Sequence, residues 1–142
     1  MMRTLGIDFG EARIGLALSD ASGTIAMPLE TIETKDKGAQ IREVAERIAS
    51  REVARIVVGL PLEMDGSAGP MAEMVEKFSA KLESTVGIDV VRWDERLTSV
   101  AAERAVREMG GRKGKKKKKK GHLDPIAACL LLQAFLDSPS AH

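Results

Sequence analysis

Acidic residues stand at three points of this sequence where a strand or a helix is expected to begin or end: Asp8, Glu95 and Asp124. Asp8 closes an apolar strand expected over residues 4–9. A carboxylate in that position is costly to bury unless it is solvated, paired or bound to a cation. The alternative is that Asp8 only begins a turn, which Gly10 would also serve. The position of Asp8 therefore indicates either a cation site or a turn.

Glu95 comes directly after a second apolar strand, expected over residues 88–93, and lies between Asp94 and Arg96. An exposed loop with a local ion pair would also explain these charges, at under about 1 kcal/mol of stability. In a mixed sheet, however, the ends of parallel neighbours meet at one edge, where such folds place their sites. We therefore expect Glu95 to approach Asp8, with Asp94 as the alternative carboxylate on the same turn.

Asp124 directly precedes Pro125. This pair is typical of a helix start, because Asp caps the first turn and Pro fits the first helical position. Taken alone, the pair favours a helix cap over a metal ligand. A carboxylate near a helix start can still face a metal ion, so Asp124 is kept as the candidate third ligand.

Three acids delivered by a strand, a loop and a helix form a set of oxygen donors. Hard divalent cations such as Mg²⁺ and Mn²⁺ prefer these ligands and keep several waters. Two such ions about 4 Å apart activate a water and stabilise the leaving oxygen when a phosphodiester is hydrolysed. The acids therefore predict a site for two Mg²⁺ or Mn²⁺ ions.

Other ligand types are poorly represented. Neither His122 nor His142 has the spaced partners of a zinc site. His122 is kept as an accessory candidate because it lies close to Asp124. Cys129 is the only cysteine and sits inside an apolar run, which excludes a disulfide framework and favours a small core residue over a nucleophile.

Basic residues are concentrated in one segment, where residues 112–120 contain eight lysines and arginines in nine positions. Such low complexity predicts a flexible loop over about residues 110–121. Lysines neutralise phosphates without reading sequence, so we expect a mobile clamp on nucleic acid, with a merely solvated loop as the alternative. The candidate contacts are Arg112, Lys113, Lys115, Lys116, Lys117, Lys118, Lys119 and Lys120.

The elements that must position these residues follow from the apolar periodicity. Strands are expected over residues 4–9, 13–19, 24–33, 56–59 and 88–93, and helices over 36–50, 70–82, 98–109 and 124–137. A meander followed by alternating strands and helices predicts an α/β fold with helices on both faces of the sheet. The sheet is expected to be mixed and five-stranded: a three-stranded antiparallel meander plus two parallel strands, with strands 1, 4 and 5 parallel in the middle.

Length and composition are those of one globular domain spanning residues 1–142, with a short disordered tail expected over 138–142. No apolar run approaches the roughly 20 residues that a membrane span requires. A strand pattern begins almost at once, which argues against a signal peptide. We therefore expect a cytoplasmic protein without a membrane partner.

Six motifs in order, spread over most of the chain, resemble the YqgF/RuvX family. They are Gly6-Ile7-Asp8-Phe9-Gly10, Arg13-Ile14-Gly15-Leu16-Ala17, Val58-Gly59-Leu60-Pro61, Met64-Asp65-Gly66-Ser67, Asp94-Glu95-Arg96-Leu97-Thr98-Ser99 and Asp124-Pro125-Ile126-Ala127-Ala128. The resemblance implies a ribonuclease H-like nuclease that matures the 5′ end of precursor 16S rRNA or, alternatively, resolves Holliday junctions. It also implies that Asp8, Glu95 and Asp124 form the acidic triad, both catalytic and metal-binding.

The resemblance gives further residues candidate roles. Arg13 and Arg96 could contact phosphate, to which arginine binds in a bidentate manner. Residues 65–70, including Ser67, precede a helix whose amides could meet a phosphate, although an ordinary turn and cap would look the same. The implied partners are precursor rRNA or branched DNA, with the ribosomal subunit as a further candidate. A monomer and a homodimer both stay open, since only a four-way junction favours paired sites.

Two other classes of function compete with this interpretation. Nucleotide-binding domains of the actin or sugar-kinase kind also begin with Gly-x-Asp-x-Gly, but they need two lobes and this chain has room for one. A non-catalytic nucleic-acid-binding module would bind RNA in a salt-sensitive manner without metal-dependent cleavage.

Overall fold

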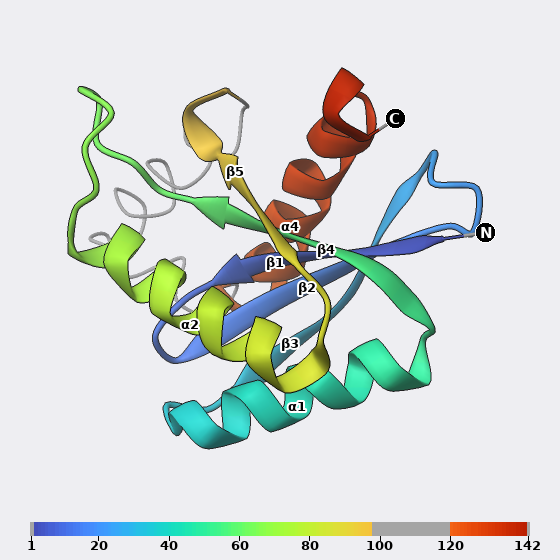
Figure 1. Cartoon of the computed structure of the whole chain (residues 1–142), viewed down its shortest axis with the longest axis horizontal. Coiled ribbons are helices and arrows are strands. Elements are labelled where there is room, and N and C mark those ends of the chain that lie inside the picture. Colours follow the sequence, from blue (N-terminus) through green and yellow to red (C-terminus); the bar gives the residue numbers. More distant parts are fainter. Residues whose placement is uncertain (1, 98–119, 142) are drawn as a thin grey trace.

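The computed structural model describes residues 2–97 and 120–141, and at 97 and 120–124 it describes the backbone alone. A five-stranded sheet with the order β3-β2-β1-β4-β5 forms its centre (Figure 1). The strands are β1 Arg3–Phe9, β2 Arg13–Ser19, β3 Ala26–Glu33, β4 Val53–Leu60 and β5 Val90–Asp94. β1, β2 and β3 pair antiparallel, and β4 pairs parallel with both β1 and β5. The predicted mixed sheet is confirmed, although β5 lies at an edge and not in the middle.

Three helices cover the sheet in the described residues: α1 Lys37–Ser50, α2 Pro70–Val86 and α4 Lys120–Leu136. α1 begins after Asp36, whose side chain accepts a hydrogen bond from the Gly38 amide at 3.1 Å. α2 ends at Gly87, which adopts a left-handed φ of 74° that costs glycine little. The predicted helix over residues 98–109 lies outside the described residues.

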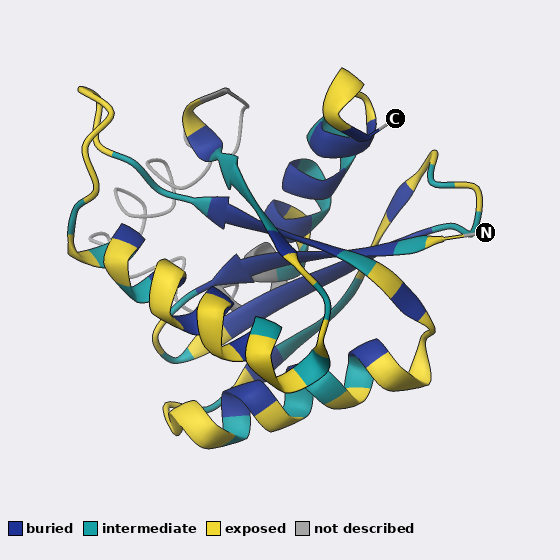
Figure 2. Cartoon of the chain, in the orientation of Figure 1, coloured by how far each residue is buried: buried dark blue, intermediate teal, exposed yellow. Residues whose placement is uncertain are grey.

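The helices lie on both faces of the sheet, as expected, with α1 and α2 on one side and α4 on the other (Figure 1). Side chains alternate along a strand, so β1 serves both layers. Leu5, Ile7 and Phe9 belong to the core beneath α1 and α2. Gly6 faces α4 closely enough that a Cβ there would lie 2.8 Å from Leu132 Cβ. The central strands are buried along most of their length (Figure 2).

The last helix differs from its prediction. α4 begins at Lys120, so Asp124 lies within the helix and is not its N-cap, and Pro125 stands inside it. Residues 120 and 121, expected in the flexible loop, are helical. Proline cannot donate to the residue four positions earlier, which costs the helix one backbone bond. The apolar segment after Pro125 packs on the sheet, and we attribute the survival of the helix through this residue to that packing.

The disorder expected over residues 138–142 does not hold for Pro139–Ala141, which form a short 3₁₀ helix, η3. Arg55 Nη1 donates to the Ala141 carbonyl at 2.8 Å, and Ala141 is 8% exposed. The tail is therefore held by a contact from β4 that sequence periodicity does not reveal. In the described ranges 2–97 and 120–141, no helix is both long and apolar enough to cross a membrane.

Candidate active site

Asp8 is the penultimate residue of β1 and is only 4% exposed. It is paired with Gly15 of β2. Because Ile7 and Phe9 point toward the core under α1 and α2, the alternation of the strand places the Asp8 side chain on the α4 face. The structure thus buries a carboxylate at the carboxyl end of a central strand.

Glu95 opens the short 3₁₀ helix η1, Glu95–Leu97, directly after β5, and is 2% exposed. Its carboxylate packs against Gly59 of β4 so closely that a Cβ at Gly59 would collide with Glu95 Oε1. Gly59 follows Val58, which is in register with Ile7 of β1, so Gly59 lies beside Asp8. The missing side chain of Gly59 therefore makes the space in which Glu95 reaches the face that carries Asp8.

The backbone of α4 brings Asp124 to the same end of the sheet. Ala128 contacts β1 at Gly6, where a Cβ would lie 3.2 Å from the Ala128 carbonyl oxygen. One helical turn of about 5.4 Å separates Ala128 from Asp124, and two strand residues of about 6.7 Å separate Gly6 from Asp8. The C-terminal end of α4 lies near the opposite end of β1. Arg55 is in register with Thr4 and donates to the carbonyl of Ala141, which follows the helix. Asp124 therefore lies alongside the end of β1.

Asp94 occupies a different environment from Glu95. Both of its carboxylate oxygens accept hydrogen bonds from the Arg96 side chain, the shortest being Nη2 to Oδ2 at 2.7 Å. This hydrogen bonding from Arg96 holds the pKa of Asp94 below its usual value. The geometry favours Glu95 as the second site carboxylate and gives Asp94 the role of positioning Arg96.

Arg96 also contacts the loop between β4 and α2. Its Nη1 donates to the Met64 carbonyl at 3.3 Å and approaches the Glu63 carbonyl at 3.5 Å. Most donors of this guanidinium are therefore engaged within the protein. Arg96 therefore links η1 to the loop, and with 38% of its side chain exposed its contact with phosphate stays a prediction.

The residues before α2 contain a turn held by Asp65, and their contact with a phosphate stays a prediction. Asp65 Oδ1 accepts hydrogen bonds from the Ser67 hydroxyl at 2.7 Å and the Ser67 amide at 2.9 Å. These bonds from Ser67 lower the pKa of Asp65. The Glu63 carboxylate lies against Gly69, the residue that precedes α2, so an acid already occupies the positive end of the helix.

The basic candidates are only partly described. Arg13 lies at the start of β2 and forms an ion pair with Glu33 at 3.3 Å, with 43% of its side chain exposed. His122 and Lys120 belong to α4 by their backbone. The predicted contacts Arg112, Lys113, Lys115, Lys116, Lys117, Lys118 and Lys119 lie outside the described residues.

The donors that converge at this edge fit a hard cation. Asp8 and Glu95 offer carboxylate oxygens, and Asp124 adds a third acid whose side chain is not described. Among the described residues no group of three potential ligands is present, because only two members of the triad contribute side chains. A site of oxygen donors alone suits Mg²⁺ or Mn²⁺ and not zinc.

Gly59 is the functional residue to which sequence reasoning assigned no role. It follows the apolar, β-branched residues Ile56, Val57 and Val58, and glycine within a strand marks a place where another group approaches closely. That signal was available in the sequence. The approaching group is Glu95, and this can be seen only in the structure, where β4 pairs with β5 and Gly59 lies opposite Trp93.

Comparison with known proteins agrees with this fold. The family described as "RuvX: Holliday junction resolvase" matches residues 2–138. A protein of Ruminiclostridium cellulolyticum named "Putative pre-16S rRNA nuclease" is 44% identical over 138 residues, covering 96% of this chain and 94% of the relative. A protein of the same name from Chloroflexus aurantiacus is 45% identical over 134 residues, covering 94% of this chain and 86% of the relative.

Solved structures share the architecture at low identity. RuvC of Thermus thermophilus in complex with a Holliday junction substrate superposes with a TM-score of 0.59 at 18% identity, covering 95% of this chain and 94% of that one. The Holliday junction resolvase of fowlpox virus gives a TM-score of 0.52 at 13% identity, covering 96% of this chain and 99% of that one. These likenesses establish the ribonuclease H-like fold, and the family match and close relatives show that the chain belongs to the RuvX (YqgF) family of nucleases.

Proposed function

We propose that this protein is a metal-dependent nuclease of the cytoplasm that processes the 5′ end of precursor 16S rRNA. One observation carries the proposal: the Glu95 carboxylate lies in the space left by Gly59, on the strand beside Asp8. Carboxylate oxygens gathered at one edge of a sheet are the ligands that a hard divalent cation prefers. The arrangement therefore supports a site for a divalent cation.

Each acid has a structural reason for its position. Asp8 is held by the β1 ladder, Glu95 by η1 and by contact with Gly59, and Asp124 by α4. Together they would hold Mg²⁺ or Mn²⁺, two ions by analogy with other nucleases of this geometry. When bound, the ions would act as Lewis acids that stabilise negative charge on the substrate phosphate and would favour ionisation of water. The rigid placement of the acids would fix where the ions sit.

Substrate binding is assigned to the basic groups near this edge. Arg13 and the lysine-rich residues 112–120 would neutralise backbone phosphates without reading bases. Each neutralised phosphate of a single strand contributes about −0.7 to the slope of log K against log salt. Binding by even four of these residues would therefore weaken about fiftyfold between 50 and 200 mM salt. The same segment makes the ribosomal subunit, which is rich in phosphate, a fitting partner.

RNA is preferred over DNA as the substrate because close relatives carry the name of a precursor 16S rRNA nuclease. The family description favours a second candidate, the resolution of Holliday junctions. That activity requires two cuts, and hence a symmetric dimer with paired sites, whereas rRNA processing is compatible with a monomer.

The deciding experiment compares precursor 16S rRNA with four-way junction DNA, each in Mg²⁺, Mn²⁺ or EDTA. Cleavage of the rRNA near its mature 5′ end, abolished by EDTA, supports the proposal. Symmetric cutting of the junction with the rRNA left intact would transfer the function to the second candidate. Tight, salt-sensitive binding of RNA without metal-dependent cleavage of either substrate would refute catalysis and leave a binding module.

A further inference from the structure

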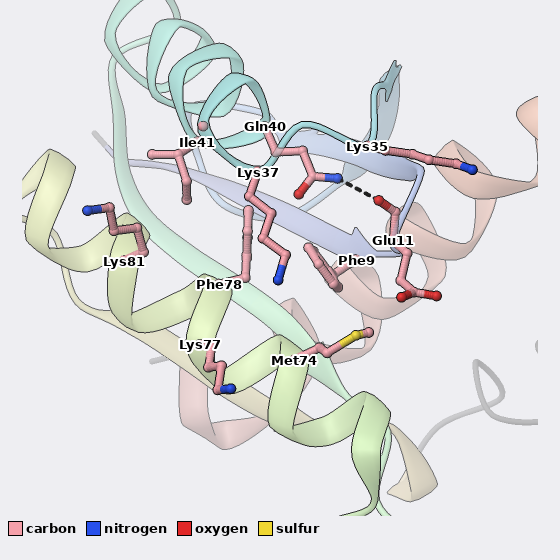
Figure 3. A pocket seen from close by; sticks show the side chains of 11 residues that line it. Phe9, Glu11, Lys35, Lys37, Gln40, Ile41, Met74, Lys77, Phe78 and Lys81 are labelled. Atoms are coloured by element: carbon pink, nitrogen blue, oxygen red, sulfur yellow. Dashed lines mark hydrogen bonds between the residues drawn. The ribbon is translucent and has the colours of Figure 1, made fainter.

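A cavity of about 600 Å³ lies between α1 and α2, on the face of the sheet opposite α4 (Figure 3). Its walls come from the end of β1, the segment before α1, and both helices. Pockets of about 300–1,000 Å³ are the size that holds small ligands and cofactors. Neither Asp8 nor Glu95 lines this cavity, so the candidate active site does not account for it.

The floor of the cavity is apolar and firmly packed. Phe9 and Phe78 contact each other with ring centroids 4.7 Å apart, and each is only 7% exposed. Ile41 from α1 and Met74 from α2 complete the floor. Two rings and a polarisable thioether offer a surface suited to a flat, weakly polar ring system.

The rim of the cavity carries four lysines: Lys35, Lys37, Lys77 and Lys81. None of them forms an ion pair with a described residue, whereas Arg47 and Arg92 are each paired with two or more glutamates. Glu11 is the acidic residue that joins them at the rim. Four cations against one carboxylate leave an excess of positive charge, which fits an anionic ligand.

Gln40 adds a polar group at the cavity wall. Its Nε2 donates to the backbone carbonyls of Glu11 at 2.9 Å and Thr34 at 2.8 Å, which fixes the orientation of the amide. The residue is 2% exposed, and its amide oxygen accepts no hydrogen bond from the described residues. In Figure 3 this oxygen lies on the side of the amide away from Glu11. It is available to accept a hydrogen bond from an amino group of a ligand.

We propose that this cavity is a nucleotide-binding site. The base packs against Phe9 and Phe78 with its amino group toward Gln40, and the phosphate contacts the lysines of the rim. An apolar floor, an isolated acceptor and a cationic rim match the ring, the amino group and the phosphate of a nucleotide.

The nucleotide can come from either of two sources. Phe9 and Asp8 are the last two residues of β1 and point to opposite faces, so the cavity and the proposed catalytic carboxylates lie at the same end of the sheet. An unpaired nucleotide of an RNA substrate that passes around this end would occupy the cavity, in which case the inference rests on the proposed nuclease function. A free nucleotide that acts as an effector could also occupy it, and then the inference is independent of that function.

The test titrates the full-length protein with AMP, GMP, inorganic phosphate and a single-stranded pentaadenylate in EDTA, so that a failure of metal-dependent cleavage does not affect the result. The Gln40 side-chain amide and the Phe9 ring are followed by NMR, and affinity is measured by calorimetry. AMP or GMP should shift both signals and bind more tightly than phosphate. Tighter binding of pentaadenylate than of AMP would assign the site to the substrate, and the reverse order to a free nucleotide.

A pair of matched variants tests the role of the rim. The double substitution Lys77→Gln/Lys81→Gln removes two cations from exposed positions of α2 and should weaken nucleotide binding about tenfold. Arg3→Gln/Arg51→Gln removes the same charge at positions outside the cavity and should leave the affinity unchanged. The proposal is overturned if millimolar AMP and GMP shift neither signal, if phosphate binds as tightly as the nucleotides, or if both double variants lose affinity equally.

Discussion

Replacement of Gly59 by alanine tests whether the position of Glu95 matters, with one added methyl group. A Cβ at this position would collide with Glu95 Oε1 and lie 3.0 Å from both Glu95 Cδ and Cγ. The carboxylate must therefore move aside, because the backbone of the central strand β4 has no room to shift. A displacement of about 1 Å of a group in the reacting centre costs about 100-fold in rate.

The same change has a modest expected effect on stability. Overpacking by one methyl group costs about 1–3 kcal/mol, and removal of a strand glycine returns about 0.5–1 kcal/mol. The net loss of about 0–2.5 kcal/mol is small beside the usual total of about 5–15 kcal/mol, so Gly59→Ala should stay folded. Gly38→Ala is the stability control: its Cβ would meet only Asp36 Oδ1 at 3.6 Å and Arg42 Nη1 at 3.7 Å. It should unfold at a slightly higher denaturant concentration than the parent.

Single-turnover cleavage of precursor 16S rRNA in Mg²⁺ is the assay, combined with urea unfolding of each variant. Gly59→Ala should cut about 100-fold more slowly than the parent. Glu95→Gln should then cause a much smaller further loss in the Gly59→Ala background than in the parent, because both changes affect the same group. A Gly59→Ala protein that is folded and cuts at the parental rate would refute the reasoning.

Three further predictions concern contacts that support the site and the fold. Arg55→Ala removes hydrogen bonds to Thr4 Oγ1 at 3.1 Å and to the Ala141 carbonyl, together with the contact of the guanidinium with the Phe135 ring at 5.0 Å. Urea unfolding should show that the free energy of unfolding falls by about 2 kcal/mol. Arg96→Gln should release the loop between β4 and α2. The Gly66 amide, which donates to the Glu63 carbonyl at 2.8 Å, should then exchange its hydrogen several-fold faster, and an unchanged exchange rate would contradict the anchoring role of Arg96. Asp20 has its pKa lowered to about 2, first by the Ser22 hydroxyl and then by the Ile25 and Thr24 amides. A lowered pKa stabilises the fold above the unfolded value of about 3.9. The difference in free energy of unfolding between the parent and Asp20→Ala should therefore be constant above about pH 5 and shrink as the pH falls through about 2.

Much of the architecture could be predicted from the sequence because its periodicity is strong. The change from alternating to helical spacing near residue 36 matches the boundary between β3 and α1, and Asp36 is the cap of that helix. Pro28 stands in β3, which is an edge strand with a register shift in its pairing to β2 between Leu16 and Ala17. Proline is tolerated there because an edge strand has unpaired donors.

The details of the site could be predicted only in part. Asp94 and Glu95 are adjacent acids, and composition does not distinguish them. The structure does, because the paired register of β5 sends Asp94 to Arg96 while η1 turns Glu95 over Gly59. The start of α4 was misplaced because Asp124-Pro125 is a strong local helix-start signal, and tertiary packing of the residues that follow overrides it. The cavity between α1 and α2 was not predicted, since its lysines come from separate segments.

The central claim is that Asp8, Glu95 and Asp124 together hold the catalytic cations. The most direct measurement is Mn²⁺ binding followed by electron paramagnetic resonance in Asp8→Asn, Glu95→Gln and Asp124→Asn, each checked for its fold by circular dichroism. Asp94→Asn is the matched control, because that carboxylate is engaged by Arg96. Each triad variant should lose at least about tenfold in Mn²⁺ affinity, while the control binds as the parent does. If all three triad variants bind Mn²⁺ as tightly as the parent, the assignment of the metal site is wrong.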